Sequence, residues 1–348
     1  MMRLKELIFF VTRRCDLRCR TCFYAAAGAP KNAGEDELSL AEIDEVAARL
    51  RRLDSLYFSG GEPSLREDLA DICSVFWRRC RIGAIHLPSN GQDPERIRSL
   101  CLEILRRLPG IRLTLSLSLD GRAAVHDRIK GSAGCFRRAV ETARALAPLR
   151  REFPRLRLYV ITVVSCENRQ EVLPLAAWLE ESLDLDGHGP SPLRGRPRDP
   201  SLSAPAAADW RDLAAALLPF HRRWLRRGGL PRWRQALAAN RVRYLYGLYE
   251  RVLAGGGLPF PCLAGERIAV LDPEGGVRPC EQAPTVGNVR RSGFDLAAVL
   301  DGPQARQEHL QARSCACTNA CFLENSIRSH PLSRARSLLG RAPSARHG

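Results

Sequence analysis

Short apolar runs rich in β-branched residues alternate along the chain with amphipathic segments of helical periodicity. Such runs are typical of buried parallel strands, and the segments between them suit crossover helices. The runs occupy residues 7–12, 55–59, 84–89, 113–119, 158–164 and, more weakly, 182–187. Six βα units predict an α/β fold with a parallel sheet covered on both faces, either an open doubly wound sheet or a partial barrel.

Polar residues follow the predicted strands at the point where each strand ends. In parallel α/β folds the functional groups gather at this carboxyl edge of the sheet. The first strand leads to three cysteines, the second to SGGEP and the third to SNG, while the fourth and fifth end in Ser, Asp or Asn. These residues are Cys15, Cys19, Cys22, Ser59, Gly60, Gly61, Glu62, Pro63, Ser89, Asn90, Ser118, Asp120, Ser165 and Asn168. Strand ends in register predict one common site.

The composition narrows the setting of that site. The 348 residues, 45% of them hydrophobic, can bury a large core in one barrel-sized domain or two unequal ones. We expect a cytoplasmic protein, because no apolar stretch approaches the roughly 20 residues of a membrane span and the start lacks a secretory signal. Thirteen cysteines, an odd and unevenly spaced set, then indicate metal or cluster ligation rather than a disulfide framework.

The net charge of +16 suggests an anionic partner, but its source weakens that inference. Arginine supplies 51 of the 54 basic residues, a skew that a GC-rich genome also produces. The excess is greatest at residues 188–243, with 12 arginines against three aspartates, and the tail after Arg328 is also basic. Because few aromatic residues are interleaved, a solvated basic surface is favoured over a nucleic-acid site.

The motif CDLRCRTC, followed by SGGEP, SNG and SLDG at later strand ends, resembles the radical S-adenosylmethionine (SAM) enzymes. Clustered cysteines alone also occur in zinc sites. The resemblance implies that Cys15, Cys19 and Cys22 hold a 4Fe-4S cluster and leave one iron open for the methionine part of SAM. One electron from the cluster then cleaves SAM to methionine and a 5′-deoxyadenosyl radical.

The same resemblance assigns contacts to SAM. Gly60 and Gly61 would let backbone approach the ligand closely, and Glu62 would accept a hydrogen bond from its ammonium group. Further candidates are also residues that form turns and cap strand ends: Ser59, Pro63, Ser89, Asn90, Ser118, Asp120 and Asn168. His126 and Asp127 match a helix start often seen in the family and are interpreted as structural.

One position departs from the family pattern. An aromatic residue often precedes the third cysteine and packs on adenine, whereas this chain has Thr21 there, with Phe23 and Tyr24 after the cysteine. Cluster ligation is unaffected by this difference.

The remaining cysteines form two groups. Cys73, Cys80, Cys101, Cys135 and Cys166 stand singly and are assigned no role, since a free cysteine commonly behaves as a small buried hydrophobe. The other group lies near the C-terminus: Cys262, Cys280, Cys315, Cys317 and Cys321. Between its first two members, RIAVLD and VRPC are predicted to pair as a hairpin across PEGG.

This hairpin segment resembles the opening of the SPASM and twitch domains, which follow the radical SAM barrel and carry auxiliary Fe-S clusters. The full SPASM pattern has seven cysteines for two clusters, so five imply one auxiliary 4Fe-4S cluster. Its ligands would be Cys262 and Cys280 with two or three of Cys315, Cys317 and Cys321. Four thiolates also suit a structural zinc ion, which is the alternative.

These patterns divide the chain into four parts. They are a core barrel at 1–200, a helical linker at 201–255, an auxiliary-cluster domain at 256–327 and a basic tail, expected to be disordered, at 328–348. The Pro-, Gly- and Ser-rich segment after residue 187 predicts a loop, from which Arg194 and Arg196 could meet an anionic substrate or the SAM carboxylate.

The linker helices carry an apolar stripe from Trp210 to Trp224, with most arginines off it. We interpret their basic face as solvated, with a surface for a phosphorylated lipid or another anionic partner as the alternative.

The favoured function is a radical SAM enzyme that abstracts hydrogen from a peptide, or from a small molecule, lipid or sugar-linked metabolite. Its electron donor would be a protein such as flavodoxin or ferredoxin. Because the first strand begins near Leu7, no separate peptide-recognition domain is expected before the barrel, which weakens the peptide option. A cysteine-rich zinc- and RNA-binding protein would not explain SGGEP, and a non-catalytic electron-transfer protein would normally have four cysteines at its cluster.

Overall fold

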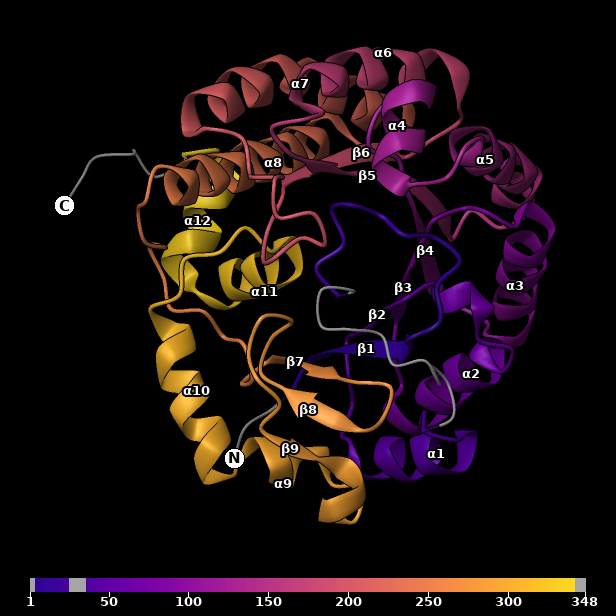
Figure 1. Ribbon diagram of the computed structural model, residues 1–348, viewed down its shortest axis with the longest axis vertical. Coiled ribbons are helices and arrows are strands. Elements are labelled where there is room, and N and C mark those ends of the chain that lie inside the picture. Colours follow the sequence, from indigo (N-terminus) through magenta and orange to yellow (C-terminus); the bar gives the residue numbers. More distant parts are fainter. Residues whose placement is uncertain (1–3, 25–35, 342–348) are drawn as a thin grey trace.

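The computed structural model describes residues 4–24 and 36–341. Its central element is a nine-stranded sheet with the strand order β6-β5-β4-β3-β2-β1-β7-β8-β9. Strands β1 to β6 are parallel and neighbour one another in sequence order, with helices between them (Figure 1). This is the arrangement of a partial (β/α)6 barrel, so the predicted α/β class is confirmed.

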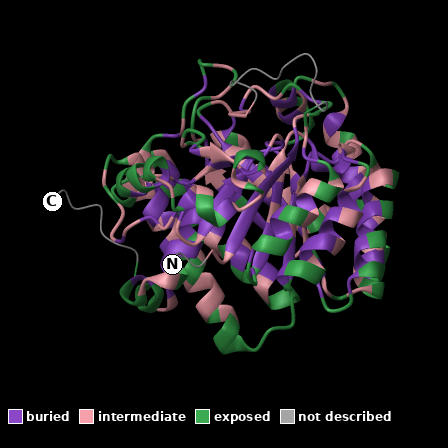
Figure 2. Ribbon diagram, turned by 90° about the horizontal axis from the view of Figure 1, so that it is seen from below, coloured by how far each residue is buried: buried purple, intermediate pink, exposed green. Residues whose placement is uncertain are grey.

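Five of the six predicted strands lie where the apolar runs placed them. They are β1 (Glu6–Thr12), β2 (Ser55–Gly60), β3 (Ala84–Ser89), β4 (Arg112–Ser118) and β5 (Leu156–Val164). The helices that connect them and the sixth strand are α1 (Leu40–Arg49), α2 (Leu69–Cys80), α3 (Pro94–Arg107), α4 (Ala123–Lys130), α5 (Cys135–Glu152) and α6 (Val172–Ser182). Figure 2 shows that buried residues concentrate in the sheet and on the helix faces turned toward it.

The sixth strand was predicted at the wrong place. Of residues 182–187, Ser182 ends α6 and 183–186 form the connection after it, whereas β6 spans Gly187–Pro192, within the segment predicted to be a loop. The sequence GHGPSP carries no apolar pattern. It can still pair because β6 has one strand neighbour only, β5, and an edge strand tolerates prolines that lack an amide hydrogen.

The alternation of side chains along β1 separates two hydrophobic clusters. Leu7, Phe9 and Val11 pack in the main core with residues of the covering helices. Ile8 and Phe10 point to the other face of the sheet, where they pack with Phe322 from the C-terminal part of the chain. The period of two along a strand thus assigns one face to the outer helices and the other to the barrel interior.

The predicted C-terminal hairpin is confirmed, and it is joined to the barrel. Strands β7 (Ile268–Leu271) and β8 (Gly276–Arg278) are antiparallel, and β9 (Gly287–Asn288) pairs with β8. Strand β7 also pairs in parallel with β1, from Glu6 opposite Ile268 to Phe9 opposite Leu271. The cysteine-rich part of the chain therefore extends the barrel sheet beyond β1.

Helices complete the C-terminal half. The two linker helices are α7 (Ala207–Arg227) and α8 (Arg232–Leu253), followed later by α9 (Leu296–Leu300), α10 (Pro303–Arg313), α11 (Ala320–Ser329) and α12 (Pro331–Leu339). The expectation of a disordered tail is wrong for α12, because Asn240 Nδ2 donates to Leu338 O at 2.8 Å and ties this helix to α8. Residues 342–348 of the expected tail lie outside the described residues. Among the helices described, none has the length and apolar character needed to cross a membrane.

Candidate active site

The three cysteines of CDLRCRTC lie on the loop that leaves the carboxyl end of β1. Cys15 is exposed, and Cys19 and Cys22 are partly buried. Distant segments hold this cysteine loop, residues 13–24, in place: Arg20 N donates to Ile129 O at 2.8 Å, and Cys22 O accepts from Arg198 N at 3.0 Å. The Arg20 side chain also pairs with Glu167. The loop is therefore fixed by α4, by the strand end of β5 and by the chain after β6.

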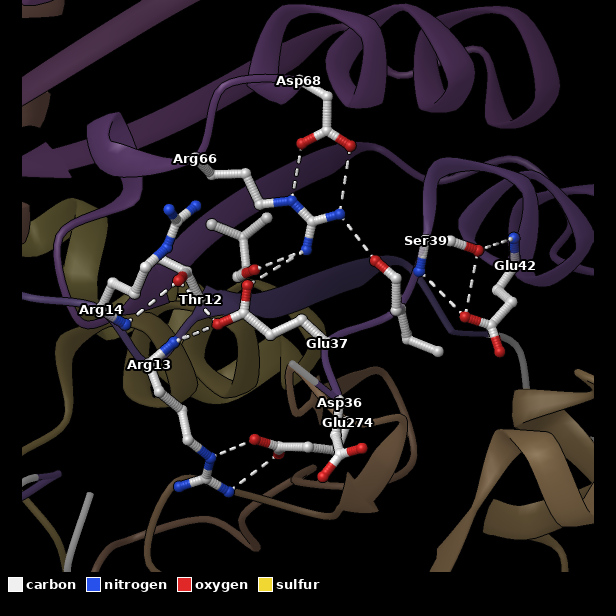
Figure 3. A network of polar contacts seen from close by, with 12 residues as sticks. Thr12, Arg13, Arg14, Asp36, Glu37, Ser39, Glu42, Arg66, Asp68 and Glu274 are labelled. Atoms are coloured by element: carbon white, nitrogen blue, oxygen red, sulfur yellow. Dashed lines mark hydrogen bonds and ion pairs between the residues drawn. The ribbon is translucent and has the colours of Figure 1, made fainter. Parts of the chain in front are cut away.

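A buried ion pair fixes the start of the cysteine loop (Figure 3). Glu37 Oε1 accepts hydrogen bonds from Thr12 Oγ1 at 2.7 Å and from Arg13 N at 2.8 Å. Arg66 donates to Val11 O at 3.0 Å and lies 3.7 Å from the other oxygen of Glu37. The side chains of Glu37 and Arg66 are each 7% exposed. No sequence signal pointed to either residue, since their contact joins segments far apart in the chain.

The cysteine loop is also tied to the hairpin of the C-terminal part. The Arg13 guanidinium makes two hydrogen bonds with the Glu274 carboxylate in the turn between β7 and β8 (Figure 3). This pairing raises the pKa of Arg13. Both ends of the chain thus contribute to the position of the loop.

SGGEP meets the cysteine loop through its backbone. Gly61 N donates to Thr12 O and Glu62 N to Arg14 O, both at 2.8 Å. A Cβ atom on Gly60 would lie 2.4 Å from Thr12 O, and one on Gly61 would lie 2.0 Å from Arg14 O. From the sequence, these glycines were expected to let the backbone approach SAM closely. In the structure the close approach is to the chain's own cysteine loop, so any larger residue would displace that loop.

Glu62 links SGGEP to the strand end of β3. Its buried carboxylate accepts from Asn90 N at 2.7 Å and from Ser64 Oγ at 2.7 Å. Burial raises the pKa of Glu62, and these hydrogen bonds oppose the shift. Asn90 Nδ2 in turn donates to Asp16 Oδ1 at 2.6 Å. SGGEP, SNG and the cysteine loop therefore form one connected unit.

Three other predicted residues of these strand ends lie within the same unit. Ser59 pairs with Phe10 in the register of β1 and β2. Pro63 is buried and begins a short 3₁₀ helix. Ser89 Oγ accepts from Gly91 N at 3.0 Å and shapes the turn after β3.

The buried ammonium group of Lys130 lies at the strand end of β4. Lys130 Nζ donates to Ser118 Oγ at 2.6 Å and lies 2.8 Å from Asp120 Oδ2, and Lys130 and Asp120 are buried. Burial lowers the pKa of Lys130, but the charges of Asp120 and Cys19 outweigh it and leave the pKa raised. In the other direction, burial raises the pKa of Cys19 and the charge of Lys130 lowers it. Sequence analysis missed Lys130, because a lysine at a helix end carries no distinguishing pattern.

The side-chain amide of Asn168 is hydrogen-bonded to other groups of the chain. Its Nδ2 donates to Asp120 O at 2.6 Å and to Val163 O at 2.9 Å, and its Oδ1 accepts from Ser165 N at 2.7 Å. Both amide hydrogens are therefore used within the chain. This arrangement fits a residue that positions the ends of β4 and β5, and it argues against the predicted contact with SAM.

His126 and Asp127 also have structural partners. His126 Nδ1 accepts from Asp120 N at 3.0 Å. Asp127 accepts from Gly134 N at 2.6 Å and from Phe136 N at 2.8 Å, which satisfies amide groups at the start of α5.

Arg194 lies next to the C-terminal cysteine group rather than at the strand end of β4. It donates to Glu281 Oε2 at 2.7 Å, and its guanidinium lies 5.4 Å from the centroid of the Phe23 ring. Glu281 also accepts from Asn319 Nδ2 at 2.7 Å. The expected contact between Arg194 and the SAM carboxylate is therefore not favoured, because Lys130 is the cation near Cys19.

Four of the five C-terminal cysteines interact with one another. The Cys317 thiol donates to Cys315, which lowers the pKa of Cys315 to about 6 and raises that of Cys317. Burial raises the pKa of Cys262 to about 11, with smaller contributions from Cys280 and Cys315. Cys321 differs: burial raises its pKa to about 12, and the charged groups acting on it are Glu281, Arg194, Glu324 and Glu6.

The chemistry of the two cysteine groups suits iron-sulfur or zinc ligation. None of the thirteen cysteines forms a disulfide, and within the described ranges no three His, Cys, Asp or Glu side chains are already arranged as a metal site. The first group supplies three thiols and the second at least four, and neither CDLRCRTC nor CACTNAC contains a histidine. A set made of thiols alone favours soft metal centres.

A cavity of about 770 Å³ joins the two groups. Thr21 and Phe23 of the cysteine loop line one part, and Asn319 and Cys321 line another. Arg194, Arg241 and Glu324 supply charge. Most of the remaining lining is aromatic or aliphatic and comes from β5, α7, α8, α11 and the residue after β6: Tyr159, Ile161, Leu193, Trp224, Leu225, Val242, Leu245, Tyr246, Tyr249 and Ile327. This volume is that of a small-molecule or cofactor site.

The family comparison matches the barrel. Residues 9–179 match the model of the radical SAM superfamily. Among curated proteins, Fe-coproporphyrin III synthase of Methanosarcina barkeri is 31% identical over 135 residues, which are 37% of this chain and 31% of that protein. GTP 3′,8-cyclase of Peptoclostridium acidaminophilum is 35% identical over 91 residues, 26% of this chain and 28% of that protein. The matches thus span about a third of the length of these relatives.

Solved structures share the fold over most of the chain. SuiB of Streptococcus suis bound to S-adenosylmethionine has a TM-score of 0.61 and 17% identity, over 88% of this chain and 68% of SuiB. The protein anSMEcpe, with bound AdoMet and the Cp18Cys peptide, has a TM-score of 0.57 and 18% identity, over 88% of this chain and 82% of that one. At these identities the likeness describes the fold.

Proposed function

The chain belongs to the radical SAM superfamily through residues 9–179, and on this basis we propose that it cleaves SAM reductively to begin a radical reaction on a substrate held in the cavity. The observation that carries the proposal is the connection of the cysteine loop to SGGEP and SNG. Glu62 N binds Arg14 O, and Asn90 bridges Glu62 and Asp16. These contacts would hold cluster ligands and SAM-binding groups at fixed relative positions.

Cys15, Cys19 and Cys22 would hold a 4Fe-4S cluster. When bound, such a cluster supplies the electron for SAM cleavage through an iron that no protein thiolate occupies. Lys130 supports this role, because a buried positive charge stabilises the thiolate form of Cys19, which is the form that binds metal. An external electron donor such as flavodoxin or ferredoxin would reduce the cluster.

Two buried charged groups are suited to the two ends of the methionine part of SAM. The Glu62 carboxylate retains acceptor capacity beyond its bonds to Asn90 and Ser64, so it would accept from the SAM ammonium group. Lys130 donates one hydrogen bond to Ser118 and forms an ion pair with Asp120, so a remaining ammonium hydrogen would reach the SAM carboxylate. Ser118, Asp120, Ser89 and Asn90 would orient these groups and the ribose.

The C-terminal cysteines would hold one auxiliary 4Fe-4S cluster in a SPASM- or twitch-like domain. Cys262, Cys280, Cys315 and Cys317 are the favoured ligands, because their thiols influence one another, whereas Cys321 lines the cavity. A structural zinc ion at the same four thiols is the alternative.

The cavity would receive the substrate. Its aromatic and aliphatic lining favours an apolar group, and Arg194, Glu324 and Asn319 would fix polar groups of the same molecule. Peptides are among the candidates, since a structure of similar fold is that of SuiB bound to its precursor peptide SuiA. Small molecules, lipids and sugar-linked metabolites are the other candidates.

The test is SAM cleavage by protein loaded anaerobically with iron and sulfide. With dithionite and SAM we expect release of 5′-deoxyadenosine, and Cys15→Ala, Cys19→Ala or Cys22→Ala should abolish it. Cys166→Ala is the control, because Cys166 is exposed and lies outside both cysteine groups. Cluster-loaded wild-type protein that releases no more 5′-deoxyadenosine than the Cys19→Ala variant would rule the proposal out.

A further inference from the structure

The tip of the hairpin formed by α7 and α8 has an unusual composition. We call residues 222–234, RRWLRRGGLPRWR, the hairpin tip. It contains six arginines and no acidic residue. A basic segment of this density repels itself, so it needs either carboxylates nearby or an anionic partner.

Nearby carboxylates account for only part of this charge. Arg223 and Arg227 both pair with Glu180 on α6, and Arg234 lies 5.0 Å from the centroid of the Trp233 ring. For Arg222, Arg226 and Arg232, the described residues provide no ion pair or hydrogen bond through the side chain. Four arginines of the hairpin tip, Arg222, Arg226, Arg232 and Arg234, therefore have no carboxylate partner among the described residues.

Beyond the buried Trp224, the hairpin tip and the first half of α8 contribute little to the core. No residue from Leu225 to Arg243 is buried, and the buried residues of α8 begin at Tyr244. Trp233 is 61% exposed and Leu230 is 38% exposed. An exposed tryptophan beside an exposed leucine is not explained by packing within this molecule.

We propose that the hairpin tip docks onto the surface of an anionic lipid bilayer. Arginines attract phosphate head groups, while an indole ring favours the head-group level and a leucine favours the acyl boundary. The hairpin tip presents these three kinds of side chain together at one end of two long helices. Single-stranded nucleic acid would require several stacking aromatic residues, and Trp233 is the one exposed aromatic side chain in the described chain.

The position of the hairpin tip gives docking a consequence for the cavity. Leu225 lies within the hairpin tip and Ala238 lies on α8 just after it, and both line the cavity. A bilayer at the hairpin tip would therefore adjoin the apolar part of the cavity. The docking itself does not depend on the radical chemistry proposed above.

Vesicle co-sedimentation of the full chain tests the inference. We expect the protein to pellet with phosphatidylcholine vesicles that contain about a third phosphatidylglycerol, to stay in solution with pure phosphatidylcholine, and to dissociate as salt is raised. The triple variant Arg222→Gln, Arg226→Gln, Arg232→Gln should bind anionic vesicles about 100-fold more weakly, since each arginine near such a surface contributes about fivefold. Trp233→Ala should also weaken binding.

A matched triple variant on the outer helices of the barrel serves as the control. Arg78→Gln, Arg106→Gln, Arg144→Gln removes the same charge from exposed positions on α2, α3 and α5, away from α7 and α8 (Figure 1). It should bind as the wild type does, and both triples should keep their melting temperature and their SAM cleavage without vesicles. Equal loss of binding in the two triples, equal binding to neutral vesicles, or binding to RNA but not to vesicles would each overturn the proposal.

Discussion

The Lys130 ammonium lies 2.8 Å from the Asp120 carboxylate, and both side chains are buried at the strand end of β4. Lys130→Met would leave the carboxylate buried without its partner, so we expect the free energy of unfolding to fall by about 3–5 kcal/mol. Urea unfolding followed by circular dichroism measures this change. The double variant with Asp120→Leu should be less destabilised than Lys130→Met, because no unpaired charge remains. A double variant as unstable as the sum of the singles would contradict this account.

The contact between Gly61 and the cysteine loop makes a second prediction. Gly61→Ala would place a Cβ 2.0 Å from Arg14 O, so the loop must move and cluster assembly should fail. Gly83→Ala is the control, since its new Cβ would lie no closer than 3.9 Å to Asp54 O. Iron content and visible absorption after reconstitution compare the two variants. Full iron loading of Gly61→Ala would show that the loop tolerates the displacement.

The third prediction concerns which C-terminal cysteines are ligands of the auxiliary cluster. Cys262→Ala, Cys280→Ala, Cys315→Ala and Cys317→Ala should each lower bound iron to about half, because one of two 4Fe-4S clusters is lost. Cys321→Ala should leave the iron content unchanged. Iron, sulfide and zinc analysis of the purified variants measures this. Iron loss in Cys321→Ala, or zinc in place of the second portion of iron, would refute the proposed set.

The fourth prediction concerns His221 and the pH dependence of stability. Burial lowers the pKa of His221 to about 4, whereas an unfolded histidine titrates near 6.5. Between these values the unfolded chain binds a proton that the folded chain does not. Stability therefore falls as pH falls from about 6.5 to about 4, by about 1.4 kcal/mol per pH unit for this group, and this contribution levels off below.

The measurement for His221 is the difference between wild type and His221→Gln. The pKa values of other histidines, including His86 and His188, are lowered as well, so the total pH dependence of the wild type is not assigned to one residue. The variant should show a shallower loss of unfolding free energy between about pH 6.5 and about pH 4. Parallel curves for the two proteins would exclude the titration of His221 as a contributor.

Much of the fold could be predicted from local sequence patterns. Five strands and the helices around them follow from periodicity, and the hairpin follows from its turn residues. The sixth strand was misplaced because GHGPSP has no apolar alternation, and its pairing depends on β5 alone. The pairing of β7 with β1 could not be predicted from the sequence, since it joins segments far apart in the chain.

The sequence by itself determined the parallel α/β architecture, the three-cysteine motif and the strand ends that surround it, because periodicity and covalent spacing are local. Only the tertiary structure decided which groups meet there. It placed Lys130 near Cys19, turned Arg194 toward Glu281, used Asn168 within the chain and placed Cys321 at the wall of the cavity. These contacts join distant segments, and they depend on how the whole sheet and its helices pack.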